Sequence, residues 1–156
     1  HAESRRQRQM CIRDSPYINP RNSIENKCEK GAYVVNLTSH ESKVTLIASG
    51  TEVELALKVQ DKLKENNIHS KVVSMPCMEL FDKQPEDYRK DILEENSLII
   101  TLEAGSVMSW QKYIKNKGAN LGIDKFGESA PYKEVYKHFK LSEEDITNFI
   151  QKKLRE

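Results

Sequence analysis

The chain has 156 residues, which is enough for one domain around a single hydrophobic core. Its 25 basic and 24 acidic side chains give a net charge of +1, so bulk charge excludes a general polyanion binder. The apolar runs are far shorter than the ~20 residues of a transmembrane helix. Three scattered cysteines exclude a disulfide framework or a zinc site of the usual spacing. Because a signal-peptide core is also missing from the sequence, we expect a protein of the cytoplasm.

The first 30 residues differ in composition from the rest. Four of the seven arginines (Arg5, Arg6, Arg8 and Arg13) precede residue 15, and no apolar periodicity accompanies them. A basic arm for nucleic acid is one interpretation of residues 1–15, and a translated, non-native adapter is the one we favour. The prolines and asparagines of residues 16–30 predict an extended linker. The domain itself is therefore expected over residues 31–156.

The predicted domain opens with two short strands and a helix. The runs Ala32–Leu37 and Val44–Ala48 predict two strands, which we expect to pair antiparallel with Ala32–Leu37 at the sheet edge. Thr51 and Glu54 have the spacing of a capping box. Apolar residues at helical spacing then predict a helix over residues 52–65.

Strand and helix patterns alternate from there to the C-terminus. The predicted strands are 71–75, 98–102 and 119–123, and the predicted helices are 85–93, 107–115, 130–139 and the segment after Ser142. Ser142 has the position of an N-cap, and Leu141 with Ile146 has the spacing of a hydrophobic staple. This alternation requires a mainly parallel sheet with helices on both faces.

One turn could bind an anion. Ser49, Gly50 and Thr51 lie between a predicted strand and a helix N-terminus, where open α/β sheets bind ligands. The turn lacks the glycine spacing of a dinucleotide or P-loop motif, and Glu52 and Glu54 would repel an anion. We favour a simple capped turn and keep these three residues as the anion-site candidate.

Two reactive side chains suggest nucleophiles. Cys77 with His69 or His138 would pair a thiol with a base, although its place at a strand end favours a packed thiol. Ser129 lies in a Glu-Ser-Ala-Pro run that lacks the second glycine of a nucleophile elbow. We interpret Ser129 as a helix N-cap, because a proline-started helix follows it.

Glu103 and Trp110 are the remaining residues of interest. Glu103 follows a buried strand, so it is the acidic group expected at the carboxyl edge of the sheet. Trp110 forms a stripe with Val107 and Ile114, which predicts an indole buried against the sheet. The alternative is a half-exposed ring that contacts missing domains or a partner subunit.

Several segments, in order from Gly31 to Leu154, resemble the C-terminal domain of transketolase. They are Gly31-Ala-Tyr-Val-Val35, Leu46-Ile-Ala-Ser-Gly-Thr-Glu-Val-Glu-Leu-Ala56, Lys71-Val-Val-Ser-Met-Pro-Cys77 with Leu80-Phe-Asp82, Leu102-Glu-Ala-Gly105 with Trp110, and Phe126-Gly-Glu-Ser-Ala-Pro131. The last is the most specific. The resemblance implies a three-layer α/β/α sandwich on a mostly parallel five-stranded sheet with one antiparallel edge strand.

The resemblance also implies a function. Transketolases of the pentose phosphate pathway move a two-carbon ketol unit from a ketose phosphate to an aldose phosphate, using thiamine diphosphate and a divalent metal such as Mg²⁺ or Ca²⁺. In the family, two other domains of a homodimer hold the cofactor, and this chain lacks both. No catalytic, cofactor-binding or metal-binding residue can be carried over, so we expect the chain alone to be inactive. Its expected partners are the missing domains and a second subunit, with no nucleic acid and no membrane.

Two alternatives stay open. The β-subunit of a 2-oxo acid dehydrogenase and deoxyxylulose-phosphate synthase both end in a related domain, although the runs Phe126–Pro131 and Ser74–Cys77 favour transketolase. A freestanding effector-binding or interaction module is the alternative outside the enzymes.

Overall fold

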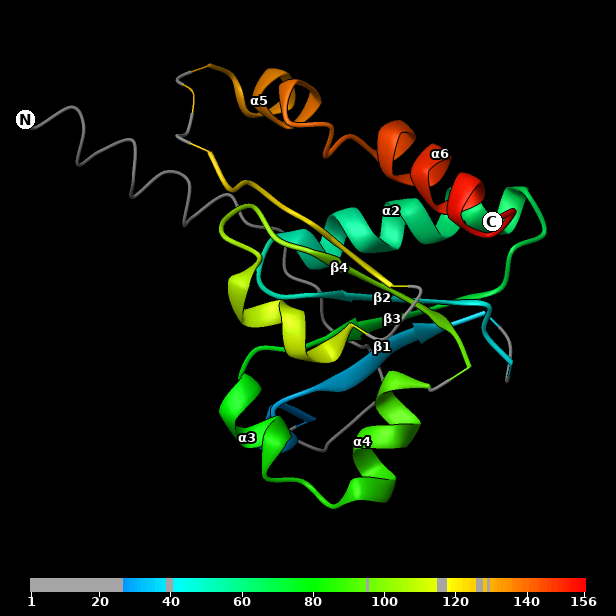
Figure 1. Ribbon diagram of the computed structural model, residues 1–156, viewed down its shortest axis with the longest axis vertical. Helices are drawn as coiled ribbons and strands as arrows, with labels where there is room; N and C mark the ends of the chain where they lie inside the picture. The colour runs from blue at the N-terminus through cyan, green and yellow to red at the C-terminus, as the bar shows by residue number, and fades with distance from the viewer. Residues whose placement is uncertain (1–26, 39–40, 95, 115–117, 126–127, 129) are drawn as a thin grey trace, which may run out of the picture.

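The computed structural model describes residues 27–38, 41–94, 96–114, 118–125, 128 and 130–156. In this part of the chain, helices cover both faces of one five-stranded sheet (Figure 1). The strands are β1 (Tyr33–Leu37), β2 (Val44–Ala48), β3 (Ser70–Ser74), β4 (Leu98–Leu102) and β5 (Ala119–Leu121). The helices are η1 (Lys27–Lys30), α2 (Glu52–Glu65), α3 (Met78–Asp82), α4 (Glu86–Leu93), η2 (Met108–Tyr113), α5 (Tyr132–His138) and α6 (Glu143–Lys153).

The sheet has the predicted mixed character. Its strand order is β1-β3-β2-β4-β5, in which β2, β3, β4 and β5 are parallel and β1 is antiparallel. The predicted pairing of β1 with β2 is wrong, because β1 pairs with β3 through registers such as Tyr33 opposite Ser74. Both edges of β2 are occupied by its parallel partners β3 and β4, so the outer edge of β3 is the one left for β1.

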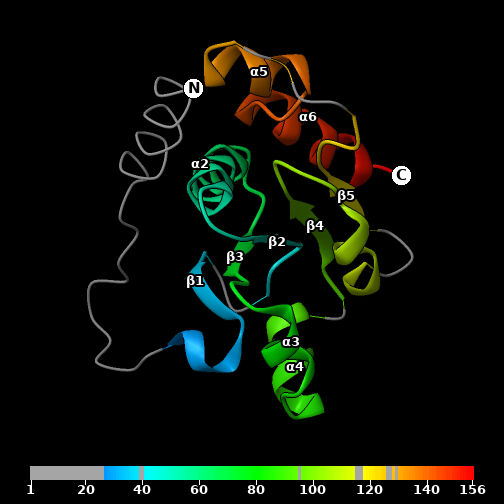
Figure 2. The ribbon, with the colours of Figure 1, turned by 90° about the vertical axis from the view of Figure 1, so that its left-hand side faces the viewer.

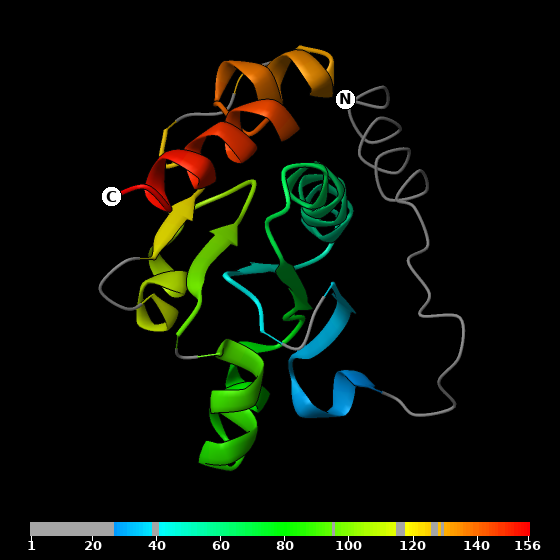
Figure 3. The same ribbon diagram turned by 90° about the vertical axis from the view of Figure 1, so that its right-hand side faces the viewer.

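Two hydrophobic cores fill the spaces between the three layers. Successive strand residues point to opposite faces, so Leu46 faces α2 and α6 whereas Ile47 faces the side of α3, α4 and η2. Figure 2, which looks along the sheet, shows α2, α5 and α6 on one side and α3 and α4 on the other. Figure 3 shows α6 beside both α2 and β5. The predicted α/β/α sandwich is confirmed.

One of the two predicted helix caps differs from the structure. Thr51 and Glu54 do not form a capping box: the Thr51 side chain makes no cap hydrogen bond, and Glu54 pairs with Lys58 at 2.9 Å. Ser142 is the N-cap of α6 as predicted, since its hydroxyl accepts a hydrogen bond from the Asp145 N–H at 3.2 Å.

The helix predicted over residues 107–115 is the shorter 3₁₀ helix η2. In a 3₁₀ helix, residues three apart lie on the same face, and this geometry buries Trp110 and Tyr113 together. Val107 and Ile114, the other members of the predicted stripe, are half-buried. Trp110 is 1% exposed, so the predicted burial of its ring is confirmed.

Only the last residues of the predicted linker fall within the described part of the chain. Residues 1–15 and most of the predicted linker lie outside the described residues. The last four linker residues form η1 rather than an extended segment, and η1 packs against α3. No helix within the described ranges has the length and apolar character needed to cross a membrane.

Candidate functional site

The topology singles out one place at the carboxyl edge of the sheet. The chain leaves β2 toward β3 on one side, while β4 lies on the other side of β2. Such a reversal opens a crevice at the carboxyl ends of the two central strands, where open α/β sheets bind ligands. Ala48 and Leu102, the last residues of these strands, are register partners. Ser49 and Glu103 follow them directly, so the predicted turn and the predicted acidic residue meet at this edge.

Glu52 lies at this edge in the first turn of α2 and is only 8% exposed. Its Oε1 atom accepts two hydrogen bonds, from Tyr136 Oη at 2.7 Å and from Thr51 Oγ1 at 3.0 Å. Burial, followed by the bond to Glu52, raises the pKa of the Tyr136 phenol, which therefore stays protonated as a donor. No local sequence pattern predicts this contact, because the two residues are 84 positions apart.

Glu103 faces the same edge from the end of β4. Its Oε2 atom accepts a hydrogen bond from the Trp110 indole N–H at 3.1 Å. Partial burial raises the pKa of Glu103, and the nearby charge of Glu52 adds to this effect while the indole bond opposes it. Glu103 is thus held at the edge as predicted.

This arrangement is unfavourable for the predicted anion site. Two carboxyl groups stand beside the turn Ser49-Gly50-Thr51, and the Thr51 hydroxyl donates to one of them. An anion there would meet the negative charge of Glu52 at the N-terminus of α2, which offsets the attraction of the helix dipole. The carboxyl groups at this edge of the sheet therefore disfavour the binding of a phosphate.

The predicted nucleophiles are not assembled. Cys77 follows β3 and its Sγ lies 3.5 Å from Glu79 Oε2. His69 precedes β3 and so lies at the opposite end of that strand, and His138 lies on α5, across the sheet from α3. Ser129 lies outside the described residues, and Pro131 is the residue at the N-cap position of α5.

A polar group that sequence reasoning missed joins α3 to η2. Asp82 accepts hydrogen bonds from Lys112 and, at 2.9 Å, from the Tyr113 hydroxyl. Burial alone would raise the pKa of Asp82, but these donors outweigh it and lower the pKa. Burial and the bond to Asp82 raise the pKa of Tyr113 to about 12. Asp82 was within a segment of the resemblance, but its partners in η2 are about 30 positions away, beyond any local pattern.

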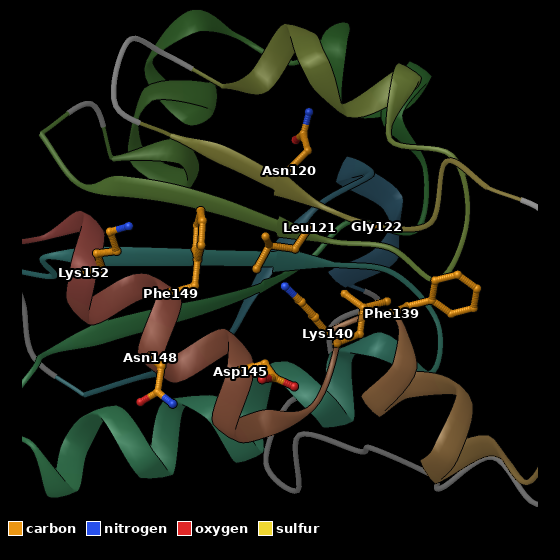
Figure 4. A pocket seen from close by; sticks show the side chains of 10 residues that line it. Asn120, Leu121, Gly122, Phe139, Lys140, Asp145, Asn148, Phe149 and Lys152 are labelled. Atoms are coloured by element: carbon orange, nitrogen blue, oxygen red, sulfur yellow. The ribbon is translucent and has the colours of Figure 1, made fainter.

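An open pocket of ≈ 400 Å³ lies between β5 and the α5–α6 segment (Figure 4). Leu121 and Phe149 form part of its apolar wall, and Lys140 and Lys152 are on its rim. Among the described residues, no group of three or more His, Cys, Asp or Glu side chains is arranged to hold a metal ion.

Comparison with known families identifies the domain. The family model "Transketolase-like TK C-terminal domain" matches residues 31–142. The chain belongs to this family. The matched range begins at Gly31, where the sequence predicted that the domain opens.

The transketolase-like domain has relatives in bacteria and plants. It is 40% identical over 125 residues to a transketolase of Bacillus subtilis, covering 79% of this chain and 19% of the relative. It is 39% identical over 127 residues to a chloroplastic transketolase of Solanum tuberosum, covering 80% of this chain and 17% of the relative. The match to the Aquifex aeolicus transketolase is 34% identical over 149 residues and covers 95% of this chain and 21% of the relative. The chain therefore spans about a fifth of the length of these relatives.

Solved structures agree on the fold. The transketolase from Leishmania mexicana superposes with a TM-score of 0.70 at 36% identity, covering 78% of this chain and 17% of that one. The transketolase from Campylobacter jejuni gives a TM-score of 0.73 at 35% identity, covering 84% of this chain and 20% of that one. The expected relation to transketolase, rather than to the other thiamine diphosphate enzymes considered, is confirmed.

Proposed function

We propose that this chain serves as the C-terminal, non-catalytic domain of a transketolase that transfers a two-carbon ketol unit from a ketose phosphate to an aldose phosphate. The family match over residues 31–142 carries the proposal. Its support is the set of relatives named transketolase, of which this chain covers 17% to 21%. The role we assign is structural: the domain stabilises the assembly of the domains that perform the reaction.

The cofactor proposed for the complete enzyme is thiamine diphosphate with a divalent metal. The described residues of this domain do not fit either group. Glu52 and Glu103 make the crevice at the carboxyl edge acidic, which disfavours a diphosphate. We therefore assign no step of the reaction to this domain, and we propose that it is inactive without the rest of the enzyme.

A more distant solved structure shares the fold of this domain. The solved structure titled "Split gene transketolase, inactive beta4 tetramer" shares the fold with a TM-score of 0.65 at 22% identity, and this chain covers 46% of it. That beta4 tetramer is described as inactive. The partners we propose here are the preceding domains and the second subunit of a homodimer.

A domain exchange tests this function. Residues 31–156 would replace the corresponding domain of the Bacillus subtilis transketolase, and the chimaera would be assayed for ketol transfer and for dimerisation. We expect an active dimer. A version that ends before this domain is the control. A chimaera that folds but neither dimerises nor transfers ketol units would contradict the proposal.

We also propose that the protein works in the cytoplasm. The bacterial relatives are named simply transketolase, whereas four of the plant relatives carry the word chloroplastic in their names. Imaging of a fluorescent fusion of the complete gene product distinguishes the two locations.

A further inference from the structure

The strand β5 has one edge that pairs with no strand among the described residues. It is the last strand in the order β1-β3-β2-β4-β5, where it pairs with the parallel strand β4. Such an edge offers a row of backbone N–H and C=O groups to which another chain can bind. We call the side of residues 119–122 that faces away from β4 the outer edge.

The hydrogen bonds of β5 show which backbone groups lie on the outer edge. Leu121 O accepts a hydrogen bond from the Glu103 N–H at 3.0 Å, and the Ile123 N–H donates to Gly105 O at 2.9 Å. In a parallel pair, one residue directs its N–H and C=O to the partner strand and the next directs both away from it. Asn120 and Gly122 therefore present their backbone groups outward. Beyond the β4–β5 ladder, neither forms a backbone hydrogen bond with a described residue.

The outer edge is held in a fixed position. A Cβ atom on Gly122 would lie 2.2 Å from Val107 Cγ1 and 2.8 Å from Gly105 O, so the end of β5 lies tightly against the segment that follows β4. On β4, the Thr101 hydroxyl donates to Asn120 Oδ1. The outward backbone groups are thus preorganised for a binding partner, which lowers the entropic cost of binding.

The pocket of ≈ 400 Å³ beside the outer edge determines which partner fits. Residues 120–122 line it together with α6 and the segment before α6. The half-buried side chains of Leu121 and Phe149 form its apolar centre. Figure 4 shows Lys140 on one side of this centre and Lys152 on the other. A partner that matches the pocket therefore carries an apolar group between two negative charges.

Both lysines are available to such a partner. Their side chains are exposed, and neither forms an ion pair with a described residue. The pocket lining also contains Asp145, but its carboxylate accepts a hydrogen bond from the Ser142 hydroxyl at the N-cap of α6. Positive charge therefore exceeds negative charge along the pocket.

Lys140 has a backbone conformation that glycine usually adopts. Its φ of 56° lies in the left-handed region, and the Leu141 N–H closes the end of α5 by donating to Tyr136 O at 2.8 Å. Glycine is the common residue at this position of a helix end, because it has no Cβ atom. Backbone strain of this kind is concentrated at binding sites. The lysine is thus retained at a cost in stability, which favours a role for its ammonium group.

The spacing of the pocket suits an extended peptide. The 11 residues of α6 span ~16 Å, and Lys140 and Lys152 lie near its two ends. A strand of five residues spans ~13 Å, and its first, third and fifth side chains point to the same face. An acidic, an apolar and a second acidic side chain on that face would therefore reach the two lysines and the apolar centre together.

We propose that the outer edge of β5 binds an extended, acidic peptide segment of a partner protein, which joins the sheet as a sixth strand. The backbone of the segment pairs with Asn120 and Gly122. One apolar side chain enters the centre of the pocket, and acidic side chains pair with Lys140 and Lys152. A small organic anion could use the lysines and the outward N–H groups but not the outward C=O groups. The inference does not rest on the proposed function, because every group that it uses belongs to this domain.

NMR of the ¹⁵N-labelled chain tests the site. The probe is the peptide acetyl-Glu-Thr-Val-Thr-Glu-amide, which places valine between two glutamates on one face. We expect saturable shift changes at residues 119–122 with a midpoint at or below about 1 mM, the weak end of specific binding. Added salt should raise the midpoint. Absence of saturable changes at these residues would overturn the proposal.

Amide exchange separates strand addition from binding in the pocket alone. With the peptide bound, the amides of Asn120 and Gly122 should exchange more slowly, because they gain hydrogen bonds. The amides of Leu121 and Ile123 already face β4 and should change less. A complex in which neither outward-facing amide gains protection would show that the peptide does not extend the sheet, and the proposal would be wrong.

Two further probes test the charge and the size of the ligand on the native chain. The peptide acetyl-Lys-Thr-Val-Thr-Lys-amide should bind about tenfold more weakly, because two attractive ion pairs become repulsive. N-acetylglutamate, a small organic anion, should cause little change at residues 119–122. Equal binding of the lysine peptide, or the same shift changes with N-acetylglutamate alone, would contradict an acidic peptide as the occupant.

Variants test the two lysines. Lys140→Gly removes the ammonium group where glycine is favoured, so the domain should be at least as stable. Lys140→Gly and Lys152→Gln should each weaken binding about two- to fivefold, the range of an exposed ion pair. Lys137→Gln, an exposed lysine of α5 outside the pocket lining, is the matched control and should bind as the native chain does.

A reversal of charge completes the test. With Lys140→Glu and Lys152→Glu together, the chain should prefer the lysine peptide to the glutamate peptide. Unchanged affinity of the single variants for the glutamate peptide, or an unchanged preference of this double variant, would overturn the proposal. If a variant does not fold, the measurements with the three probes on the native chain decide the matter.

Discussion

Trp110 shows how one side chain can belong both to a core and to an edge. Its ring is buried in the core on the α3, α4 and η2 face of the sheet, and its centroid lies 6.3 Å from that of the Tyr113 ring. Its indole N–H reaches Glu103 at the carboxyl edge. The residue therefore couples the packing of η2 to the position of a carboxyl group.

Replacement of Trp110 by alanine should cost about 3–5 kcal/mol of unfolding free energy, the usual loss for a buried tryptophan. Urea unfolding followed by circular dichroism measures it. Met108→Ala is the matched control in the same helix, because Met108 is 80% exposed and its loss should stay within about 0.5 kcal/mol. A loss below about 1 kcal/mol for Trp110→Ala would mean that the ring is not packed as described.

Gly122 follows β5 at a point where the backbone of another segment comes very close. A Cβ atom there would lie 2.2 Å from Val107 Cγ1, 2.8 Å from Gly105 O and 3.0 Å from Glu103 O. Two of these neighbours are backbone oxygens, which cannot move aside easily.

Gly122→Ala should therefore destabilise the domain by about 1–3 kcal/mol, as overpacking usually does. Thermal unfolding compares it with Gly105→Ala, where the added Cβ would meet Glu103 Oε1 at an ordinary 3.5 Å. Adding Val107→Ala should restore only part of the lost stability, because the two backbone contacts remain. Equal melting temperatures for the two single glycine variants would contradict this account.

At the scale of elements, α6 is held on α2 by two kinds of contact. Ile146 and Ile150 are fully buried in the core between α6, α2 and the sheet. Lys62 lies 3.8 Å from Glu143 and 3.7 Å from Glu144, and all three side chains are accessible to solvent. Exposed ion pairs of this kind contribute little, whereas buried apolar side chains contribute much.

Ile150→Ala should accordingly cost about 2–5 kcal/mol, and Lys62→Gln less than about 1 kcal/mol. Chemical denaturation with urea, in low and in high salt, measures both. Added salt should reduce the small effect of Lys62→Gln and leave that of Ile150→Ala unchanged. A larger loss for the lysine variant would show that charge, not burial, docks α6.

The elements that sequence could predict are those with a local signal. The strands β2, β3 and β4 carry short apolar or β-branched runs, and the helices α2 and α6 carry apolar residues at helical spacing, so their type and approximate range followed from sequence. The pairing of β1 did not, because register depends on which strand has a vacant edge. The contacts of Glu52 with Tyr136 and of Asp82 with Tyr113 also join distant positions. Glu103 was predictable at the edge because it directly follows a buried strand.

At the scale of the whole molecule, the domain alone should not bind thiamine diphosphate. Its described residues include no cluster of possible metal ligands, and the crevice is acidic. Calorimetric titration with the cofactor and magnesium should show no saturable heat. Saturable binding with a micromolar dissociation constant, about −8 kcal/mol, would contradict this expectation. The complete Bacillus subtilis transketolase is the positive control.

The place of β1 in the sheet has a consequence for synthesis on the ribosome. Its partner β3 follows only after β2 and the whole of α2. Thr38 and Ser70, which are hydrogen-bonded at the end of this strand pair, are 32 positions apart. At a translation rate of ~5–20 residues per second, β1 leaves the ribosome seconds before its partner. During that interval a β-branched, partly apolar segment has no strand to pair with. Translation order thus leaves β1, the first strand to be made, without its partner until β3 emerges, and the nascent chain is exposed to mispairing during that interval.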